Sequence, residues 1–153
     1  MSRVKPDLSL YFVCGAGCRT DIPLTEVVTE AVKGGVTIVQ LRDKSGDDDY
    51  TEQTAKTLLK ILKPQNIPLI INDSVKIAAT VGADGVHLGK RDGTAEEARK
   101  TLGPNALIGV SESDPDRLQT LDPAVIDYVG MGPVFATTTK PDVQVIGCLG
   151  KKF

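Results

Sequence analysis

The sequence predicts an α/β fold whose parallel strands alternate with helices along the chain. Three observations carry this prediction. Six short apolar runs rich in β-branched residues recur, and segments with a helical spacing of apolar residues separate them. Continuous apolar runs of this length are typical of strands buried on both faces of a parallel sheet. Each run also ends in polar residues, at the place where α/β folds build their active sites.

The first three predicted strands begin near residues 8, 36 and 67. Between the first two, the apolar residues from Leu24 to Val32 have helical spacing, and Gly34-Gly35 supplies a stop. Between the second and third, the acidic run Asp47 to Asp49 places carboxylates at the positive end of a helix that continues through Leu62 to Pro64. Each of these strands is therefore separated from the next by a helix.

The last three predicted strands begin near residues 84, 106 and 126. Asp73-Ser74 is a candidate cap for a short helix, Val75 to Ala79, that stops before Gly82. Thr94 to Glu97 is a capping box for a helix that reaches Leu102, and a weaker helix is predicted over residues 114–121. The alternation predicts right-handed crossovers within one domain, residues 1–153.

The distribution of polar clusters favours a barrel over an open sheet. A dinucleotide-binding fold needs a glycine-rich turn that opens a helix after its first strand. Gly15-Ala16-Gly17 lacks a third glycine at Thr20, and Pro23 delays the helix. Polar clusters after nearly every strand are instead typical of the shared rim of a barrel.

The composition is that of a soluble globular domain. The 153 residues are 41% hydrophobic and 25% charged, and the net charge of -2 gives no reason to expect nucleic-acid binding. No apolar segment approaches the roughly 20 residues of a membrane span, and the first residues lack the apolar stretch of a secretory signal. A cytoplasmic location is expected. Cys14, Cys18 and Cys148 cannot all pair, and we interpret them as reduced residues.

Gln40, Arg42 and Lys44 alternate at the end of the second predicted strand. On an extended segment, side chains two residues apart share a face, so one amide and two cations would point together. Such a set suits a multiply charged phosphate. The alternative is a solvated strand end in which Asp43 compensates the cations.

Asn72, Asp73 and Asp92 follow the third and fourth predicted strands. Two carboxylates on neighbouring strand ends could hold Mg²⁺, which takes oxygen ligands and keeps waters and substrate phosphates. The alternatives are helix capping for the first two residues and turn chemistry for Asp92. His87 lies inside an apolar strand, where a hydrogen-bonded structural histidine is the expectation.

The segment after the sixth predicted strand offers hydroxyls, backbone N–H groups and one cation. Thr137, Thr138, Thr139 and Lys140 follow Gly132-Pro133. This set suits a phosphate, and a polar surface loop is the alternative.

Taken together, these stretches resemble the thiamine-phosphate synthase (thiamine-phosphate pyrophosphorylase) family over about residues 8 to 147. The resemblance rests on Gln-x-Arg-x-Lys, Asn-Asp, Gly-Val-His-Leu-Gly, Ile-Gly-Val-Ser and Thr-x-Thr-Lys, in the order in which the family has them. Gly-Val-His-Leu-Gly alone would also fit the related thiazole tautomerases.

The resemblance implies a (β/α)₈ barrel enzyme that joins hydroxymethylpyrimidine diphosphate to thiazole phosphate. It also implies that Mg²⁺ assists the departure of diphosphate and that the thiazole nitrogen captures the resulting cation-like species. The charges of Arg42, Lys44 and Lys140 would stabilise the leaving group, and no general base is needed. The implied contacts are Gln40, Arg42, Lys44 and Asn72 with the pyrimidine diphosphate, Asp73 and Asp92 with Mg²⁺, Ser111 and Lys140 with the diphosphate, and Thr137 and Thr139 with the thiazole phosphate.

The chain also departs from the family's pattern. Ser74 replaces the usual Arg, Lys90 replaces the usual Gln, and about six β/α units are present where the barrel has eight. Strands seven and eight are expected to be missing, as in a C-terminally truncated member. We therefore expect an open barrel whose edges favour homo-oligomers, and two alternatives remain: an inactive or partner-dependent ligand-binding fragment, or a tautomerase-like relative.

Overall fold

The structure is a computed structural model that describes residues 5–17, 21–137 and 145. Within these residues strands and helices alternate, as the apolar runs predict. The strands are β1 (Tyr11–Cys14), β2 (Ile38–Leu41), β3 (Leu69–Asn72), β4 (Gly85–Leu88), β5 (Leu107–Ser111) and β6 (Tyr128–Gly130). The helices are α1 (Leu24–Lys33), α2 (Asp48–Leu62), the 3₁₀ turn η1 (Lys63–Gln65), α3 (Val75–Val81), α4 (Ala95–Leu102) and α5 (Pro115–Leu118).

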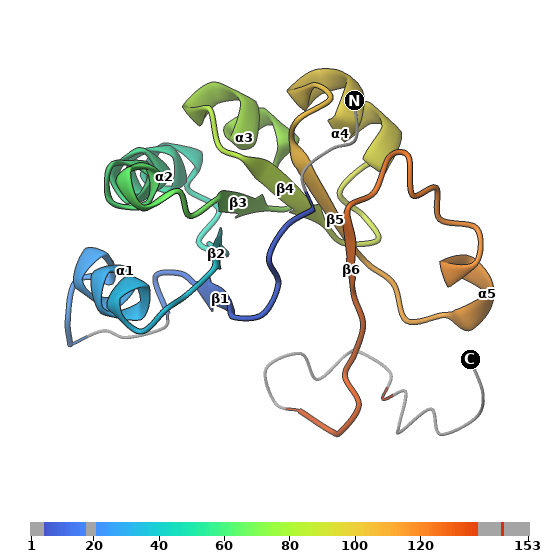
Figure 1. Ribbon diagram of the computed structural model, residues 1–153, viewed down its shortest axis with the longest axis horizontal. Coiled ribbons are helices and arrows are strands. Elements are labelled where there is room, and N and C mark those ends of the chain that lie inside the picture. The colour runs from blue at the N-terminus through green and yellow to red at the C-terminus, as the bar shows by residue number, and fades with distance from the viewer. Residues whose placement is uncertain (1–4, 18–20, 138–144, 146–153) are drawn as a thin grey trace.

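The strands form one parallel sheet in the order β1-β2-β3-β4-β5-β6. Figure 1 shows that the sheet curls and that helices α1 to α4 follow its outer face in an arc. This arrangement confirms the predicted parallel α/β fold of the barrel type, with each strand beside its neighbour in sequence. None of the helices in the described ranges is long and apolar enough to cross a membrane.

The helix starts follow the predicted signals, with one refinement. Asp47 caps α2 by accepting the N–H of Tyr50, and Thr94 forms a reciprocal capping box at the start of α4. Ser74 rather than Asp73 caps α3, because its hydroxyl accepts the N–H of Ile77 at 3.1 Å. Asp73 is thereby left for another role.

The last helix is shorter than the sequence predicts. We expected a helix over residues 114–121, and α5 has only four residues, Pro115–Leu118. After α5 the backbone continues in tight turns, in which Thr120 and Leu121 each donate to the carbonyl three residues back. The four-residue helix has too few turns to propagate on its own.

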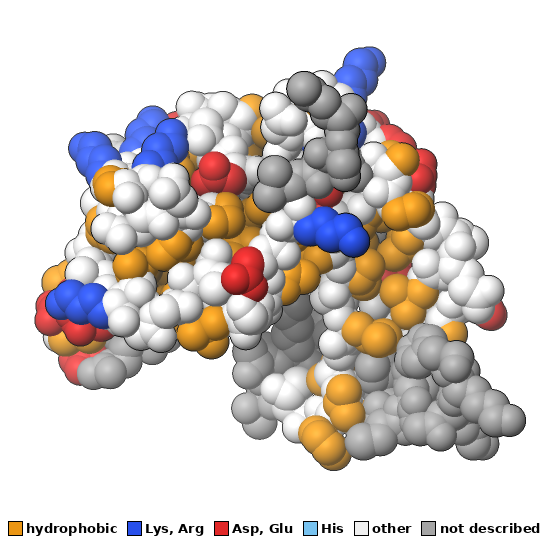
Figure 2. Space-filling view, in the orientation of Figure 1, with side chains coloured by type: hydrophobic (Ala, Val, Ile, Leu, Met, Phe, Trp, Pro, Cys, Tyr) orange, Lys and Arg blue, Asp and Glu red, His pale blue; other side chains and the backbone are white. Residues whose placement is uncertain are grey.

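Alternate residues of the strands point to the two sides of the sheet, one facing the helices and the other facing the concave interior. Val39, Leu41 and Leu69 belong to the core between the sheet and the helices, together with helix residues such as Leu58 and Leu62. The alternate strand residues Ile38 and Ile70 are fully buried on the opposite, concave side. Figure 2 shows hydrophobic side chains exposed across the middle of the visible face.

A reciprocal pair of hydrogen bonds recurs at the amino ends of three strand pairs. Before β4, the backbone N–H of Asp84 donates to the carbonyl of Leu69, and the N–H of Leu69 donates back to the Asp84 carboxylate at 2.8 Å. Thr37 makes the same pair with Leu10 through its hydroxyl, at 3.1 Å. The third pair joins Asp127 and Ile108, again at 2.8 Å. Each pair satisfies a strand-end N–H and fixes the register of β1-β2, β3-β4 or β5-β6.

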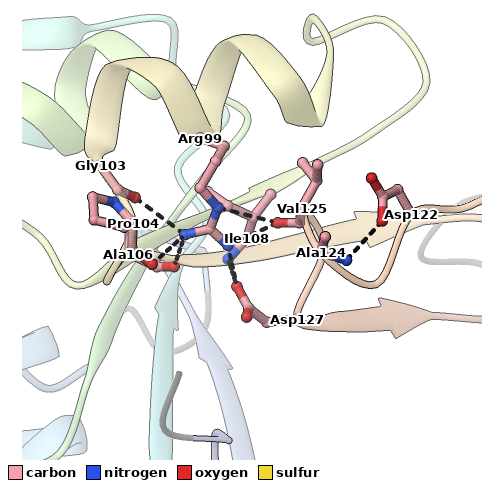
Figure 3. Close-up of polar contacts among 9 residues, drawn as sticks. All are labelled: Arg99, Gly103, Pro104, Ala106, Ile108, Asp122, Ala124, Val125 and Asp127. Carbon is pink, nitrogen blue, oxygen red and sulfur yellow. Dashed lines mark hydrogen bonds and ion pairs between the residues drawn. The ribbon is translucent and has the colours of Figure 1, made fainter. Parts of the chain in front are cut away.

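The third pair is reinforced by Arg99 of α4 (Figure 3). The guanidinium donates to the carbonyls of Gly103, Pro104, Ala106 and Val125 and pairs with the Asp127 carboxylate at 2.6 Å. Both side chains are largely buried, with exposed fractions of 14% for Arg99 and 6% for Asp127. One side chain therefore joins the end of α4 to the starts of β5 and β6.

Replacing Arg99 with Met is expected to lower the free energy of unfolding by about 3–5 kcal/mol, because it leaves a buried carboxylate and several carbonyls without their cation. Chemical denaturation followed by circular dichroism measures the change. Lys56→Met, which removes an exposed helical ion pair with Glu52, is the control and should cost at most about 1 kcal/mol. Equal losses for the two variants would contradict the role given to Arg99.

Candidate functional site

The carboxyl ends of β2 to β5 meet along one rim of the curled sheet. Strand register places Leu41 beside Ile71, Asn72 beside His87, and Ser111 beside Gly130. Because the strands are parallel, the polar residues that follow each apolar run lie at this rim. The sequence-based prediction of a shared rim is therefore confirmed.

A chain of hydrogen bonds crosses the concave interior just below the rim. Gln40 donates its amide N–H to the Tyr11 hydroxyl at 2.7 Å, and the hydroxyls of Tyr11 and Tyr128 lie 2.7 Å apart. His87 then lies 3.3 Å from the Tyr128 hydroxyl and 2.9 Å from the hydroxyl of Ser111. This network links the first and last strands of the sheet across its interior, although they are not neighbours in the sheet.

His87 is a hydrogen-bonded interior residue, as predicted, and it lies between Tyr128 and Ser111. Burial raises the pKa of the Tyr128 hydroxyl far above its ordinary value, and the neighbouring Tyr11 raises it further, so Tyr128 stays neutral. Ser111 was predicted as a site residue, and the structure places its hydroxyl in this polar interior.

Two residues of the network, Tyr11 and Tyr128, were missed by the sequence analysis. The signal that could have found Tyr128 is Gly109 at the centre of β5. A Cβ at Gly109 would lie 2.1 Å from the ring carbon that carries the Tyr128 hydroxyl. The glycine therefore leaves the space that the Tyr128 ring occupies.

On the rim itself, Lys44 forms an ion pair with Asp73. Arg42, half-buried beside it, contributes a further positive charge that acts on Asp73. The alternative in which Asp43 compensates these cations is wrong. The Asp43 carboxylate instead accepts bonds from Ser45 and from Thr51 of α2, so it faces the helix layer and leaves the pair of cations toward the rim.

Asp73, which pairs with Lys44, has a left-handed backbone conformation, with φ of 68°. Among non-glycine residues, Asn and Asp take this conformation most readily, and residues held in it cluster at functional sites. The neighbouring backbone holds it there, since the Asp73 N–H donates to the carbonyl of His87 at 2.8 Å.

The carboxyl groups of Asp73 and Asp92 lie close enough for each to shift the pKa of the other. Burial, the hydrogen bond with Asp73 and its charge raise the pKa of Asp92 above its usual range. Burial opposes ionisation of Asp73 as well, but the hydrogen bonds from Lys44 and Asp92 and the charges of Lys44 and Arg42 hold the pKa of Asp73 below its usual range. Asp92 also closes its own turn by accepting the N–H of Gly89 at 2.8 Å. The predicted turn role of Asp92 is therefore compatible with its position beside Asp73.

Two carboxylates form the acidic part of the rim. The described ranges contain no group of three or more His, Cys, Asp or Glu residues suited to a metal. Hard oxygen donors from two carboxylates fit Mg²⁺, which binds few protein ligands and keeps waters and phosphates. Burial is the main cause of the raised pKa of Asp92 and the neighbouring Asp73 adds to it, so a bound cation would favour the ionised form of both carboxylates.

The remaining predicted residues are placed in part. Asn72 ends β3, half-buried, and Thr137 lies exposed in the segment after β6. Thr138, Thr139 and Lys140 lie outside the described residues, as do Cys18 and Cys148. Cys14 is a buried thiol at the end of β1.

The chain is similar to known proteins over almost its whole length. Residues 10–152 match the family model described as thiamine monophosphate synthase. A thiamine-phosphate synthase of Azorhizobium caulinodans is 48% identical over 148 residues, which cover 96% of this chain and 70% of that protein. A thiamine-phosphate synthase of Vibrio parahaemolyticus is 46% identical over 82% of this chain and 62% of its own length.

A solved structure also matches the fold. A thiamine phosphate pyrophosphorylase from Pyrococcus furiosus superimposes with a TM-score of 0.75 and is 33% identical, with 90% of this chain and 65% of that chain covered. The chain thus spans about two thirds of the length of these relatives.

Gly109→Ala is expected to destabilise the protein by about 1–3 kcal/mol, because the added methyl group overlaps the Tyr128 ring and the interior must shift. The chain has no Trp, so near-ultraviolet circular dichroism reports on its tyrosines and should lose intensity. Gly17→Ala is the control, because nothing lies within 4 Å of the Cβ it adds. An unchanged tyrosine signal in Gly109→Ala would show that the ring does not need this space.

Proposed function

The chain belongs to the thiamine monophosphate synthase family, and we propose that it joins hydroxymethylpyrimidine diphosphate to thiazole phosphate. In this reaction the bond between the pyrimidine methylene carbon and the diphosphate oxygen breaks, and diphosphate leaves with the electron pair. The lone pair of the thiazole nitrogen then forms the new bond to the methylene carbon, which gives thiamine phosphate. The observation that carries the proposal is the convergence of Arg42, Lys44, Asp73 and Asp92 above a polar interior.

The pyrimidine diphosphate is assigned to the interior and the rim together. Gln40 belongs to the hydrogen-bonded interior, where its amide can recognise a polar ring, and Ser111, which is bonded to His87, is assigned to the diphosphate. Arg42 and Lys44 lie above them with Asn72, where two cations and an amide suit the diphosphate. A substrate that spans both regions would place its reacting carbon between the neutral interior and the charged rim.

Asp73 and Asp92 are the residues that would hold Mg²⁺. When bound, the ion supplies positive charge that stabilises the oxygens of the departing diphosphate. Lys44 is already paired with Asp73, so the same carboxylate would orient both the side-chain cation and the metal. Arg42, Lys44 and Lys140 would add their charges to the leaving group, which is the electrostatic form of catalysis.

The thiazole phosphate is assigned to Thr137 and Thr139 in the segment after β6. Hydroxyls and backbone N–H groups suit a phosphate monoester. No proton has to be removed from the nucleophile, because the attacking nitrogen carries a lone pair. This agrees with an interior in which both ring nitrogens of His87 already have hydrogen-bond partners. A cytoplasmic location is also part of the proposal, and the buried thiol of Cys14 is compatible with it.

Asp73→Asn tests the metal assignment without forcing a new backbone conformation, because Asn tolerates the left-handed region. The variant should weaken Mg²⁺-dependent binding of the pyrimidine diphosphate by about tenfold or more, since it removes a charged oxygen ligand. Titration calorimetry at several Mg²⁺ concentrations measures this. Asp48→Asn, which alters an exposed carboxylate that pairs with Lys76 of α3, is the matched control.

Two results would contradict the assignment. If Asp73→Asn bound the diphosphate with the same Mg²⁺ dependence as the unaltered chain, Asp73 would not be a ligand of the ion. If the unaltered chain bound the pyrimidine diphosphate but formed no thiamine phosphate when both substrates were supplied, the chain would be a ligand-binding fragment rather than a synthase.

We also propose that copies of the chain associate through the edge strands β1 and β6. Neither strand pairs with a further strand in the described ranges, and both expose a hydrophobic side chain, Val13 at 44% and Val129 at 38%. Unpaired edges of this kind favour association. Sedimentation velocity should show oligomers that grow with concentration, and Val129→Lys should shift them toward the monomer. A monomer at all concentrations would exclude this association.

A further inference from the structure

A buried carboxylate with no role in the proposed chemistry lies directly after Ser111. Glu112 is only 8% exposed, which is unusual for a charged residue at a strand end. Its Oε1 accepts the N–H of Ser113 at 2.8 Å and of Asp114 at 3.0 Å. The bond from Asp114 in particular, with those from Ser113 and Lys90, holds the pKa of Glu112 below its usual range, so the carboxylate is ionised at neutral pH.

Two cations approach this carboxylate from different elements. Lys90, in the loop after β4, has its ammonium nitrogen 3.3 Å from Oε1. Arg117, in α5, has a guanidinium nitrogen 3.6 Å from Oε2. The two side chains are similarly exposed, at 58% and 64%. Only Lys90 belongs to a loop that carries a proposed site residue.

That loop is a closed unit. The Gly89 N–H donates to the Asp92 carboxylate at 2.8 Å, and the Asp92 N–H donates back to the Gly89 carbonyl at 3.3 Å. Lys90 lies between these two residues, so the position of Lys90 sets the position of the whole turn. An anchor on Lys90 is therefore an anchor on Asp92.

Ser113 makes a corresponding connection on the other side. Its hydroxyl donates to the carbonyl of Gly132 at 2.9 Å and accepts the Gly132 N–H at 3.3 Å. Just before it, the Glu112 N–H donates to the carbonyl of Gly130. The side chain of Ser113 thus continues the pairing of β5 with β6 beyond the end of the strands, into the segment that leads to Thr137.

We infer that Glu112 and Ser113 are positioning residues that hold the loop after β4 and the segment after β6 at fixed places on either side of Ser111. The inference rests on the proposed function, because it takes the Asp92 loop as part of the diphosphate site and Thr137 as part of the thiazole-phosphate site. Glu112 acts through Lys90 on Asp92, and Ser113 acts through Gly132 on the segment that follows it.

The competing explanation is that Lys90 contacts the diphosphate directly. The direction of the change in diphosphate affinity in Glu112→Gln distinguishes this explanation from the positioning role. If Lys90 contacted the diphosphate, Glu112→Gln would release Lys90 and remove a negative charge near an anionic ligand, so affinity would rise. If Glu112 positions the Asp92 loop through Lys90, the same substitution frees the loop and affinity falls. Lys90→Gln lowers affinity in both cases.

The experiment measures Mg²⁺-dependent binding of inorganic diphosphate to the full chain by titration calorimetry. Glu112→Gln and Lys90→Gln are each expected to weaken binding about tenfold, the low end of the effects of outer partners on metal sites. The double variant should be no weaker than either single variant, because both remove the same connection. Arg117→Gln is the matched control: it removes the other cation from the same carboxylate and should leave affinity unchanged.

A second readout does not depend on the ligand. Hydrogen exchange at the Gly89 and Asp92 amides should accelerate in Glu112→Gln and Lys90→Gln but not in Arg117→Gln. Ser113→Ala should accelerate exchange at Gly132, and Ser113→Thr, which keeps the hydroxyl, should restore protection there.

A rise in diphosphate affinity in Glu112→Gln, or exchange that is unchanged in all these variants, would overturn the inference. Absence of Mg²⁺-dependent diphosphate binding by the unaltered chain would instead overturn the proposed function. The exchange measurements would then decide alone whether Glu112 and Ser113 hold the two segments.

Discussion

Register between neighbouring strands is the constraint on which the rim depends. A shift of one residue would exchange the two faces of a strand, so that Gln40 and His87 would point into the helix layer and apolar residues would fill the interior. The reciprocal bonds of Thr37, Asp84 and Asp127 fix the starts of three strand pairs. The amino ends therefore set the register, and the carboxyl ends present the polar residues. The bonds that fix the register thus lie at the opposite end of the strands from the candidate site, the arrangement usual in barrels.

The periodic part of the fold could be predicted from sequence because it depends on local spacing. Apolar runs located all six strands, and Thr94 with Glu97 located the start of α4. The contacts that complete the site were not predictable in this way. Tyr11 and Tyr128 meet across the interior, and Glu112 is enclosed by a loop, a helix and its own backbone. The spacing of apolar residues does not predict such pairs, because the curvature of the sheet determines which side chains meet across its interior. The same limit explains why Asp73 could be read as a helix cap when Ser74 takes that role.

The charged residues at the rim have different partners. Lys44 pairs with Asp73, and Asp92 closes a turn in which Lys90 pairs with Glu112. Asp43 takes no part, because the alternation of β2 turns it toward Thr51. In the described residues every buried side-chain N or O atom has a hydrogen-bond partner. At the rim itself, the positive charges of Lys44 and Arg42 offset the charge of Asp73, which lets the two carboxylates lie close together.

The contact between Tyr11 and Tyr128 has a consequence for the order of assembly. These residues are 117 positions apart, and each lies on an edge strand. Closing so long a segment costs chain entropy that only the finished sheet can offset, whereas each pair of neighbouring strands closes a short one. The interior network should therefore form last, after the strands have added one by one. During synthesis β6 would leave the ribosome after the earlier strands, so the contact between Tyr11 and Tyr128 could form only once Tyr128 has emerged. Among the described strands, the hydrogen-bonded interior therefore requires both β1 and β6 to be in place.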